Sequence, residues 1–155
     1  MVNTGDKAPG FTLYDADKKE RNLSEFLAKG HKTILAFFPG AFTGTCTTEL
    51  CTFRDMFDEL QRMNGGLVGI SVNDPFSNKA FGEKYGFQFP LLSDFKRETV
   101  RKYGVSWKDL GGVKGYDVAN RAIFVLNDEG KIVYKWVAPN PGVLPNFDEI
   151  KTALR

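Results

Sequence analysis

The chain has 155 residues, of which 42% are apolar and 26% are charged, and its formal net charge is +2. This length supports one domain with a full hydrophobic core, and this composition excludes a disordered chain. The basic residues are spread along the sequence, which argues against nucleic-acid binding. Apolar runs are too short to span a membrane and the N-terminus lacks a signal-peptide core, so we expect a single domain over residues 1–155, located in the cytoplasm.

The N-terminal quarter of the chain predicts two short strands, a short helix and a buried strand. A loop leads into a strand at Phe11–Leu13, and Glu20–Asn22 is expected to return antiparallel to it. Ser24 then lies at the start of a short helix that Gly30 ends. The stretch Lys32–Phe38 contains an apolar run without alternation, which favours a strand covered by helices on both faces.

The longest predicted helix follows this strand. From Thr43 to Met63, apolar residues recur at three- and four-residue spacing and give the helix one apolar face. The later elements are a strand at Leu67–Val72, a helix at Pro75–Tyr85, a strand at Phe89–Ser93, a helix at Glu98–Tyr103, a loop at Gly104–Val118, strands at Arg121–Leu126 and Lys131–Val137, and a final helix at Asn146–Leu154. This order predicts an α/β fold with a central mixed β-sheet flanked by helices.

Cys46 lies where the buried strand gives way to the long helix. In the first turn of a helix, unsatisfied backbone N–H groups and the helix dipole stabilise a thiolate. The chain has one other cysteine, Cys51, and a reducing compartment keeps both as thiols. Composition alone favours a simpler interpretation, in which both cysteines are small buried apolar residues.

The residues before Cys46 resemble the active-site signature of the peroxiredoxins. The spacing Pro-x-x-x-Thr-x-x-Cys is met by Pro39, Thr43 and Cys46. The resemblance continues through most of the chain, in Gly5–Leu13, Pro90–Asp94, Tyr103–Val105 and Asn120–Val125. It implies a thioredoxin-like fold and the reduction of peroxides, with hydroperoxides as substrates and no cofactor.

The same resemblance implies a role for each residue of the site. Cys46 would attack the peroxide, and Arg121 would supply two donors that favour the thiolate and the charge on the leaving oxygen. Thr43 would orient the peroxide, and the Pro39 ring would shield the thiolate from water. Glu49 lies one turn after Cys46 and would hold the arginine, although its spacing fits a surface acid equally well.

Cys51 raises the question of how an oxidised Cys46 is recycled. The sequence Cys-Thr-Thr-Glu-Leu-Cys resembles the peroxiredoxin Q, or bacterioferritin co-migratory, subgroup, which implies a Cys46–Cys51 disulfide. Five residues along an intact helix separate Cα atoms by roughly 8.7 Å, and a disulfide needs about 4.4–6.8 Å, so the helix would have to unwind. The loop Pro-Gly-Ala-Phe-Thr instead resembles the peroxiredoxin 5 and alkyl hydroperoxide reductase E groups, which leaves a one-cysteine enzyme as an alternative.

Other functions have weaker support in the sequence. A single histidine, His31, expected in a surface loop, and two cysteines without a CxxC motif do not indicate a metal site or a thioredoxin-type oxidoreductase. The glycines at positions 65, 66 and 69 lie at and inside a predicted strand, which is the wrong context for a phosphate loop. A redox-sensing or holdase protein that uses Cys46 is the alternative to an enzyme.

The partners and the surface are only loosely defined by the sequence. The resemblance implies a thioredoxin-like or other thiol reductant, and we expect no nucleic acid and no membrane as partners. The protein is expected to be a monomer or a homodimer. Four aromatic residues could line an apolar mouth, form a dimer interface or pack in the core: Phe42, Phe87, Phe89 and Trp107.

Overall fold

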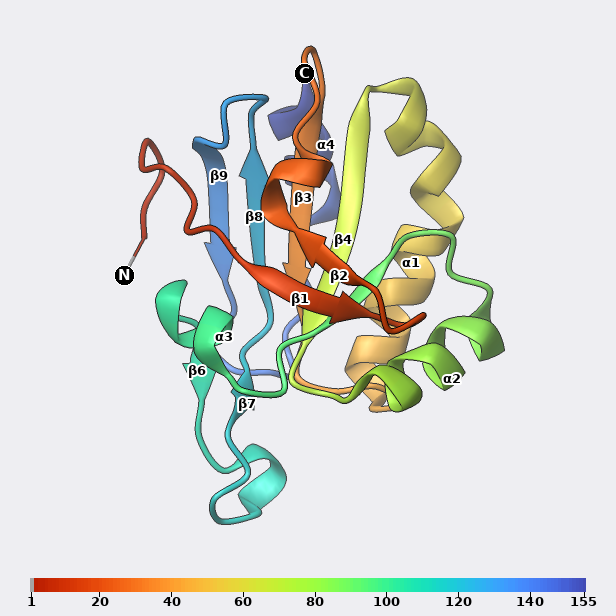
Figure 1. Cartoon of the computed structure of the whole chain (residues 1–155), viewed down its shortest axis with the longest axis vertical. Coiled ribbons are helices and arrows are strands. Elements are labelled where there is room, and N and C mark those ends of the chain that lie inside the picture. The colour runs from red at the N-terminus through yellow and green to blue at the C-terminus, as the bar shows by residue number, and fades with distance from the viewer. Residues whose placement is uncertain (1) are drawn as a thin grey trace.

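A mixed β-sheet forms the centre of the structure, a computed structural model that describes residues 2–155. Within those residues its seven strands follow the order β2-β1-β5-β4-β3-β8-β9 (Figure 1). The pairs β3–β4 and β4–β5 are parallel, and the other pairs are antiparallel. The strands are β1 (Thr12–Asp15), β2 (Glu20–Asn22), β3 (Lys32–Phe37), β4 (Gly65–Ser71), β5 (Leu91–Ser93), β8 (Ala122–Leu126) and β9 (Ile132–Val137).

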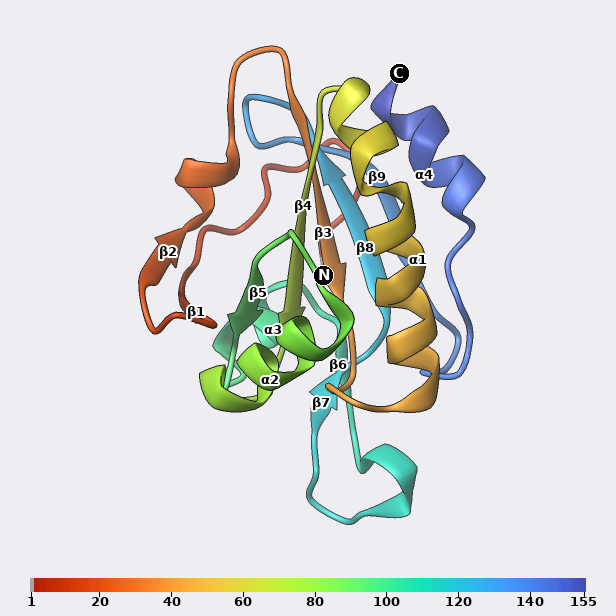
Figure 2. The ribbon, with the colours of Figure 1, turned by 90° about the vertical axis from the view of Figure 1, so that its right-hand side faces the viewer.

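Helices cover both faces of this sheet. One face carries α1 (Gly44–Arg62), α2 (Pro75–Tyr85) and α4 (Phe147–Leu154), and Figure 2 shows α1 and α4 along the same side of the central strands. The other face packs against α3 (Glu98–Lys102), the 3-10 helix η1 (Leu23–Phe26) and the N-terminal segment. The predicted α/β architecture with a central mixed sheet is therefore confirmed.

The middle strand β3 shows why its sequence lacks alternation. Ile34, Ala36 and Phe38 belong to the apolar cluster under α1, α2 and α4. Leu35 and Phe37 belong to the cluster on the opposite face. Because successive side chains point to opposite faces and both faces are covered, every position in the run is apolar.

Because of the strand directions, three segments that are distant in the sequence lie together at one end of the central strands. The parallel strands β3 and β4 both end there, so the segments that follow them leave the sheet side by side. Strand β8 runs antiparallel to β3 with Phe37 opposite Ala122, and Arg121 therefore lies beside the end of β3. Helix α1 begins at this end of the strands.

The prediction that Gly104–Val118 is a loop is wrong in part. It contains β6 (Ser106–Trp107), paired with β7 (Val118–Ala119), and a short 3-10 turn, η2 (Leu110–Gly112). This hairpin projects below the main sheet in Figure 1. Two-residue strands are too short to leave a period-2 pattern, and three glycines with positive φ shape the turn: Gly111, Gly112 and Gly115. A smaller difference concerns the first helix, which is 3-10 and ends before Gly30.

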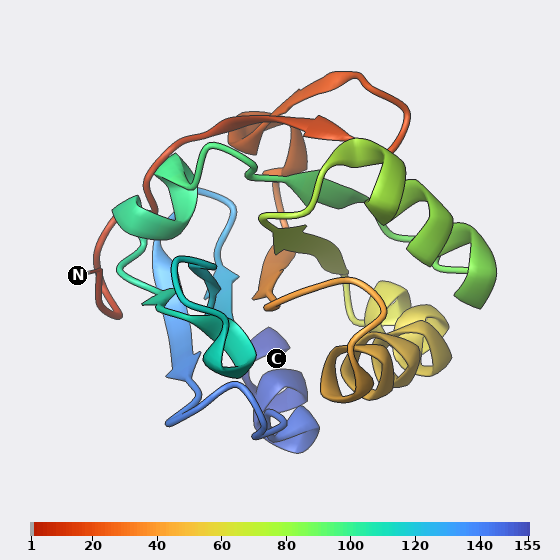
Figure 3. The same cartoon turned by 90° about the horizontal axis from the view of Figure 1, so that it is seen from below.

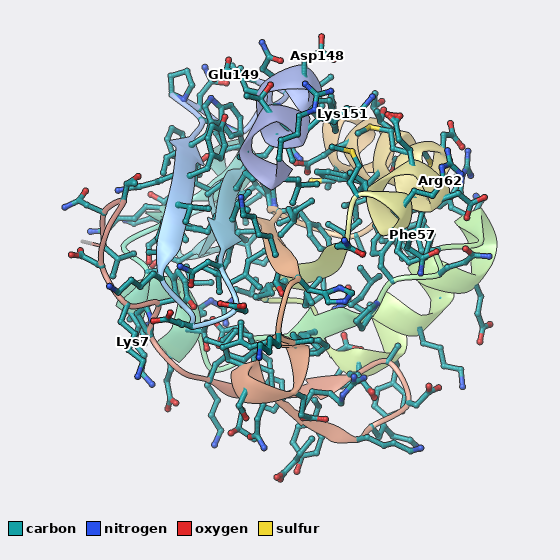
Figure 4. The ribbon with its side chains drawn as sticks, turned by 90° about the horizontal axis from the view of Figure 1, so that it is seen from above. Lys7, Phe57, Arg62, Asp148, Glu149 and Lys151 are labelled. Carbon is teal, nitrogen blue, oxygen red and sulfur yellow. The ribbon has the colours of Figure 1, made fainter. Side chains whose placement is uncertain are left out.

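Helix α4 is tied both to α1, its neighbour on the same face of the sheet, and to the start of β3. Lys151 Nζ pairs with Glu59 Oε1 of α1 at 2.7 Å, and Figure 4 shows Lys151 on α4, near the end of α1 that carries Arg62. Lys32 Nζ donates to the carbonyls of Ala153 and Arg155, at 3.0 and 2.9 Å, where a cation is favourable at a helix C-terminus.

The glycines of β4 serve the packing of this sheet. A Cβ at Gly65 would lie 2.9 Å from Leu154 Cδ1, so only glycine lets α4 approach unhindered. A Cβ at Gly69 would lie 2.7 Å from Leu91 Cδ2. Close packing therefore accounts for these two glycines.

Candidate active site

Cys46 lies in the first turn of α1, as the sequence predicts. Thr43 is the N-cap residue, and Gly44, Thr45 and Cys46 are the first three helical residues. The helical hydrogen-bond ladder starts with Thr47 N, which donates to the Thr43 carbonyl at 2.9 Å. First-turn N–H groups lie outside this ladder and, with the helix dipole, favour an anion close to them. The Cys46 side chain is fully buried among the surrounding elements.

The guanidinium of Arg121 lies between Cys46 and Glu49. Its Nη2 donates to Cys46 Sγ at 3.3 Å, and its Nη1 donates to Glu49 Oε1 at 2.7 Å. Arg121 is 1% exposed and Glu49 is 0% exposed. The alternative in which Glu49 is a surface acid is therefore wrong, and the carboxyl contacts Arg121, as the peroxiredoxin resemblance implies.

A backbone carbonyl fixes the guanidinium from a third direction. The Pro141 carbonyl accepts from Arg121 Nε at 3.3 Å and from Nη2 at 2.8 Å. Asn120 fixes the backbone beside it, because its Oδ1 accepts from Arg121 N and its Nδ2 donates to the Ala138 carbonyl, both at 2.8 Å. The contribution of Pro141 was not predicted, since a carbonyl acceptor has no signature in a sequence.

Burial sets the charges of this cluster. Desolvation raises the pKa of Glu49 to about 7, although the Arg121 guanidinium acts in the opposite direction. Burial also disfavours the charge of Arg121, but Glu49 and Cys46 outweigh it, raise the pKa of Arg121 and keep it cationic. Within residues 2–155, Glu49 Oε2 is buried without a hydrogen-bond partner, which adds to the cost of ionising this carboxyl.

Thr43 and Pro39 lie on the loop between β3 and α1. The Thr43 hydroxyl donates to the Gly40 carbonyl at 2.7 Å. A hydroxyl has one hydrogen and two lone pairs, so Thr43 is left with acceptor capacity toward a ligand. Pro39 is buried and its ring offers no N–H, so it covers this side of the site without competing for a hydrogen bond.

A pocket of about 390 Å³ opens beside these residues. Its lining residues come from the start of α1, the β6–β7 hairpin and the loop before α4. Figure 3 shows these three segments at one end of the molecule, seen from below. Its residues are Pro39, Thr43, Gly44, Thr45, Leu110, Gly111, Val113, Tyr116, Arg121, Pro141 and Gly142. The apolar wall from the hairpin was missed in the sequence because Gly104–Val118 carries little periodicity.

The four candidate mouth aromatics lie elsewhere. The residues that line this pocket, all within the described range, include none of them. Phe87 and Phe89 stack with ring centroids 5.1 Å apart in the cluster on the α1 face, and Trp107 packs against the core of the other face. Phe42 is half exposed and packs on Phe81 of α2, with centroids 5.1 Å apart. Packing thus accounts for Phe87, Phe89 and Trp107.

Cys51 lies on α1 five residues after Cys46 and is partly exposed. Both cysteines are free thiols in this structure, and the helix that carries them is continuous from Gly44 to Arg62. Residues five apart on a helix are rotated by about 140°, so the two thiols leave the helix on different faces. Cys51 is therefore not part of the cluster around Arg121 in this conformation.

The described residues 2–155 contain no group of three or more His, Cys, Asp and Glu side chains placed to hold a metal ion. His31 is exposed beside the turn before β3, as expected. Over the same residues, none of the helices has both the length and the apolar character required to cross a bilayer.

Comparison with known proteins identifies close relatives. A model of the AhpC/TSA family matches residues 4–135. The chain is 37% identical to a chloroplastic peroxiredoxin Q of Populus jackii over 84% of its own length, and spans 58% of that relative's length. It is 33% identical to peroxiredoxin Bcp of Escherichia coli K12, over 98% of this chain and 89% of that protein.

Solved structures of peroxiredoxins also have the fold of this chain. Peroxidoxin BcpB from Mycobacterium tuberculosis has a TM-score of 0.86 at 30% identity and covers 99% of this chain and 97% of its own. A peroxiredoxin Q of Xanthomonas campestris has a TM-score of 0.78 at 27% identity, covering 93% of this chain and 89% of its own. The thioredoxin-like fold that the resemblance implies is confirmed.

The raised pKa of Glu49 predicts how stability changes with pH. Between its ordinary value of 4.5 and about 7, the folded protein keeps a proton that the unfolded chain has released. The free energy of unfolding therefore falls as pH rises through this window, by an amount on the order of 3 kcal/mol from this residue. Glu49→Gln, which is neutral at every pH, should lose that dependence.

Urea unfolding of both reduced proteins at pH 5 and pH 8 measures the effect. The stability of the wild type relative to Glu49→Gln should be lower at pH 8 than at pH 5. A relative stability that stays constant or rises with pH would show that Arg121 keeps Glu49 ionised across the whole range.

Proposed function

The chain belongs to the AhpC/TSA family and has relatives named peroxiredoxins, and we propose that it is a thiol-dependent peroxidase. It would use Cys46 to reduce hydrogen peroxide and organic hydroperoxides. One observation carries this proposal: a buried guanidinium donates to Cys46 Sγ at 3.3 Å and is held by Glu49 at 2.7 Å. Such a cation favours the thiolate, which is the nucleophilic form of cysteine.

The proposed reaction starts with attack of the Cys46 thiolate on one oxygen of the peroxide. A sulfur–oxygen bond forms, the oxygen–oxygen bond breaks, and the departing oxygen leaves with a proton as water or an alcohol. Cys46 becomes a sulfenic acid. Negative charge develops on the departing oxygen, and the donors of Arg121 and of the first turn of α1 stabilise it there.

Thr43 and Pro39 complete the proposed site. The Thr43 hydroxyl already donates to Gly40, so it would accept a hydrogen bond from the O–H of the peroxide and orient it for attack. The buried Pro39 would keep bulk water away from the sulfur. Their shared position on the pocket wall with Arg121 supports these roles.

We propose that Cys51 resolves the sulfenic acid. Its thiol would attack the Cys46 sulfur, release water and leave a Cys46–Cys51 disulfide, which an external dithiol of the thioredoxin type would reduce. The partial exposure of Cys51 supports this role, and the continuous helix requires that its first turns unwind. This cycle needs a reducing compartment, and we propose the cytoplasm.

Single cysteine variants test the proposed cycle. Cys46→Ser should remove peroxide consumption, because the nucleophile is lost. Cys51→Ser should consume one equivalent of peroxide and then stop, unless a small thiol is added. Stopped-flow consumption by the reduced proteins, with the mass of each product after non-reducing digestion, measures both effects.

Two outcomes would favour other interpretations. A Cys51→Ser protein that cycles normally with thioredoxin would support a one-cysteine enzyme. A wild type that reacts no faster than a free thiol would support the redox sensor or holdase instead.

Hydrogen exchange tests the unwinding that a Cys46–Cys51 disulfide requires. Amides between Thr43 and Arg54 should lose protection in the oxidised protein, because the Cα separation of an intact helix is too long for the bond. Amides of α4 serve as the internal control and should be unchanged. Unchanged protection between Thr43 and Arg54, in a protein whose intramolecular disulfide is verified, contradicts the proposed unwinding.

The apolar wall of the pocket supports organic hydroperoxides as substrates. Val113, 58% exposed, and Tyr116, 37% exposed, line the pocket beside Arg121 and would contact the organic group. Val113→Ser should lower the rate constant for cumene hydroperoxide about fivefold relative to that for hydrogen peroxide, as expected for the loss of one apolar contact.

Val133→Ser provides the matched control, because Val133 is a 37% exposed valine on β9. Its ratio of the two rate constants should equal that of the wild type. An equal ratio in all three proteins would remove the pocket as the organic subsite.

A further inference from the structure

The loop that carries Thr43 depends on one peptide group. The Gly40 carbonyl accepts from the Thr43 hydroxyl at 2.7 Å and from Thr43 N at 3.4 Å. The position of this carbonyl therefore sets the direction in which the Thr43 lone pairs point. Between the two residues, Phe42 has a φ of +65°, an unfavourable value for a bulky side chain that persists only where surrounding contacts hold it.

The N–H of the same peptide group is bound by a residue from another part of the chain. Asn73 Oδ1 accepts from Ala41 N at 2.9 Å. Ala41 N and the Gly40 carbonyl oxygen belong to one planar unit, so they cannot rotate independently. Asn73 on one side and Thr43 on the other thus hold opposite ends of a single rigid group, and hydrogen bonds in such a chain also strengthen each other.

Asn73 is itself held at the end of β4. Its backbone N–H donates to Ser71 Oγ at 3.3 Å, and the Ser71 hydroxyl in turn donates to Asn78 Oδ1 at 3.3 Å. Asn78 Nδ2 donates to Ser93 Oγ at 3.1 Å, and all three partners are at most 1% exposed. This buried chain of polar groups links the Asn73 backbone to β5 and α2, and so fixes the position from which the Asn73 side chain extends.

A second contact ties the same loop to α2. The Phe42 ring packs on Phe81 with centroids 5.1 Å apart, and Lys84 Nζ lies 6.0 Å from the Phe42 centroid. The loop is thus attached to the β4–α2 segment at two adjacent residues, once by a hydrogen bond and once by a ring. Of the two attachments, the hydrogen bond is the one that acts on the peptide that orients Thr43.

We propose that Asn73 is a positioning residue for peroxide reduction, which acts on Thr43 through the Gly40–Ala41 peptide; this inference rests on the proposed function. A purely structural role in the Asn-Asp-Pro turn predicts something different. If the role were only structural, replacing Asn73 would lower the stability of the protein. It would then change the rate constant by the same factor whether or not the Thr43 hydroxyl is present.

A double-mutant cycle separates the two roles. The second-order rate constant of the reduced protein with hydrogen peroxide is measured by stopped flow for the wild type, Asn73→Ala, Thr43→Val and the double variant. Asn73→Ala should lower the rate constant by about 10- to 100-fold, the range expected when a group that orients substrate is misplaced. In the Thr43→Val background the same change should cost less than about twofold, because the group it positions is absent.

Two further variants complete the experiment. Asn73→Asp keeps an acceptor oxygen and should stay within about threefold of the wild type. Ser77→Ala removes a hydrogen bond to Asp74 in the same turn, without a contact to Ala41, and should also stay within that range. If Asn73→Ala does not fold, Asn73→Ser replaces it, since its hydroxyl is one bond shorter and falls short of Ala41 N.

The outcomes distinguish this inference from the proposed function. Losses that multiply in the double variant, an unchanged rate constant in Asn73→Ala, or an equal loss in Ser77→Ala would each overturn the positioning role while the wild type and Cys46→Ser still define a peroxidase. A wild type that reacts no faster than a free thiol overturns both.

Discussion

A buried cation between two groups that can carry negative charge is the constraint on which this structure depends. An isolated guanidinium is costly to remove from water, so Arg121, at 1% exposure, needs partners on every side. It finds them in Glu49, Cys46 and the Pro141 carbonyl, which come from α1 and the loop before α4. The pairing of β3 with β8 then becomes a requirement of the site, because it places Arg121 beside the strand that leads into α1.

Helix α1 has to be intact for the first step of the proposed reaction and has to open for the second. While it is intact, its first turn holds Cys46 beside Arg121 and at the N-terminal end of the helix, where the helix dipole favours an anion. The proposed disulfide requires that turn to open. The attachments of α1 to its neighbour suggest where the opening would stop: Asn73 holds the loop before the helix, and Arg54 Nη1 donates to the Tyr85 carbonyl at the end of α2, at 2.9 Å. The turn before α2 and the last residue of α2 thus contact the chain on either side of this first turn.

Sequence reasoning worked where the signal is local or carried by a side chain. The helical pattern placed Cys46 in a first turn, and Glu49 three residues later reaches the same side of the helix. The apolar run of β3 predicted a strand covered on both faces. Arg121 was brought to Cys46 by resemblance, not by pattern, since no local rule links residues on different strands.

The remainder could not be read from the sequence, for physical reasons. The Pro141 carbonyl contributes through its backbone, which every residue has. The β6–β7 hairpin has strands of two residues, below the length at which alternation can be recognised, so the pocket wall of Val113 and Tyr116 was missed. The alternatives for Phe87 and Phe89, an apolar mouth or core packing, could not be separated from the sequence, because the packing of these rings in the cluster on the α1 face is a tertiary property.

We propose that the fork of Arg121, and not only its charge, makes Cys46 reactive toward peroxides. The most direct measurement is the second-order rate constant of the reduced Arg121→Lys protein with hydrogen peroxide, compared with that of the wild type by stopped flow. Lysine keeps the positive charge, but its donors share one nitrogen and cannot reproduce the planar fork whose Nη1 reaches Glu49 and whose Nη2 reaches Cys46. The rate constant should fall about 100-fold or more, as for removal of a donor to a developing oxyanion. A rate constant within about threefold of the wild type would contradict it and would leave charge alone as the cause.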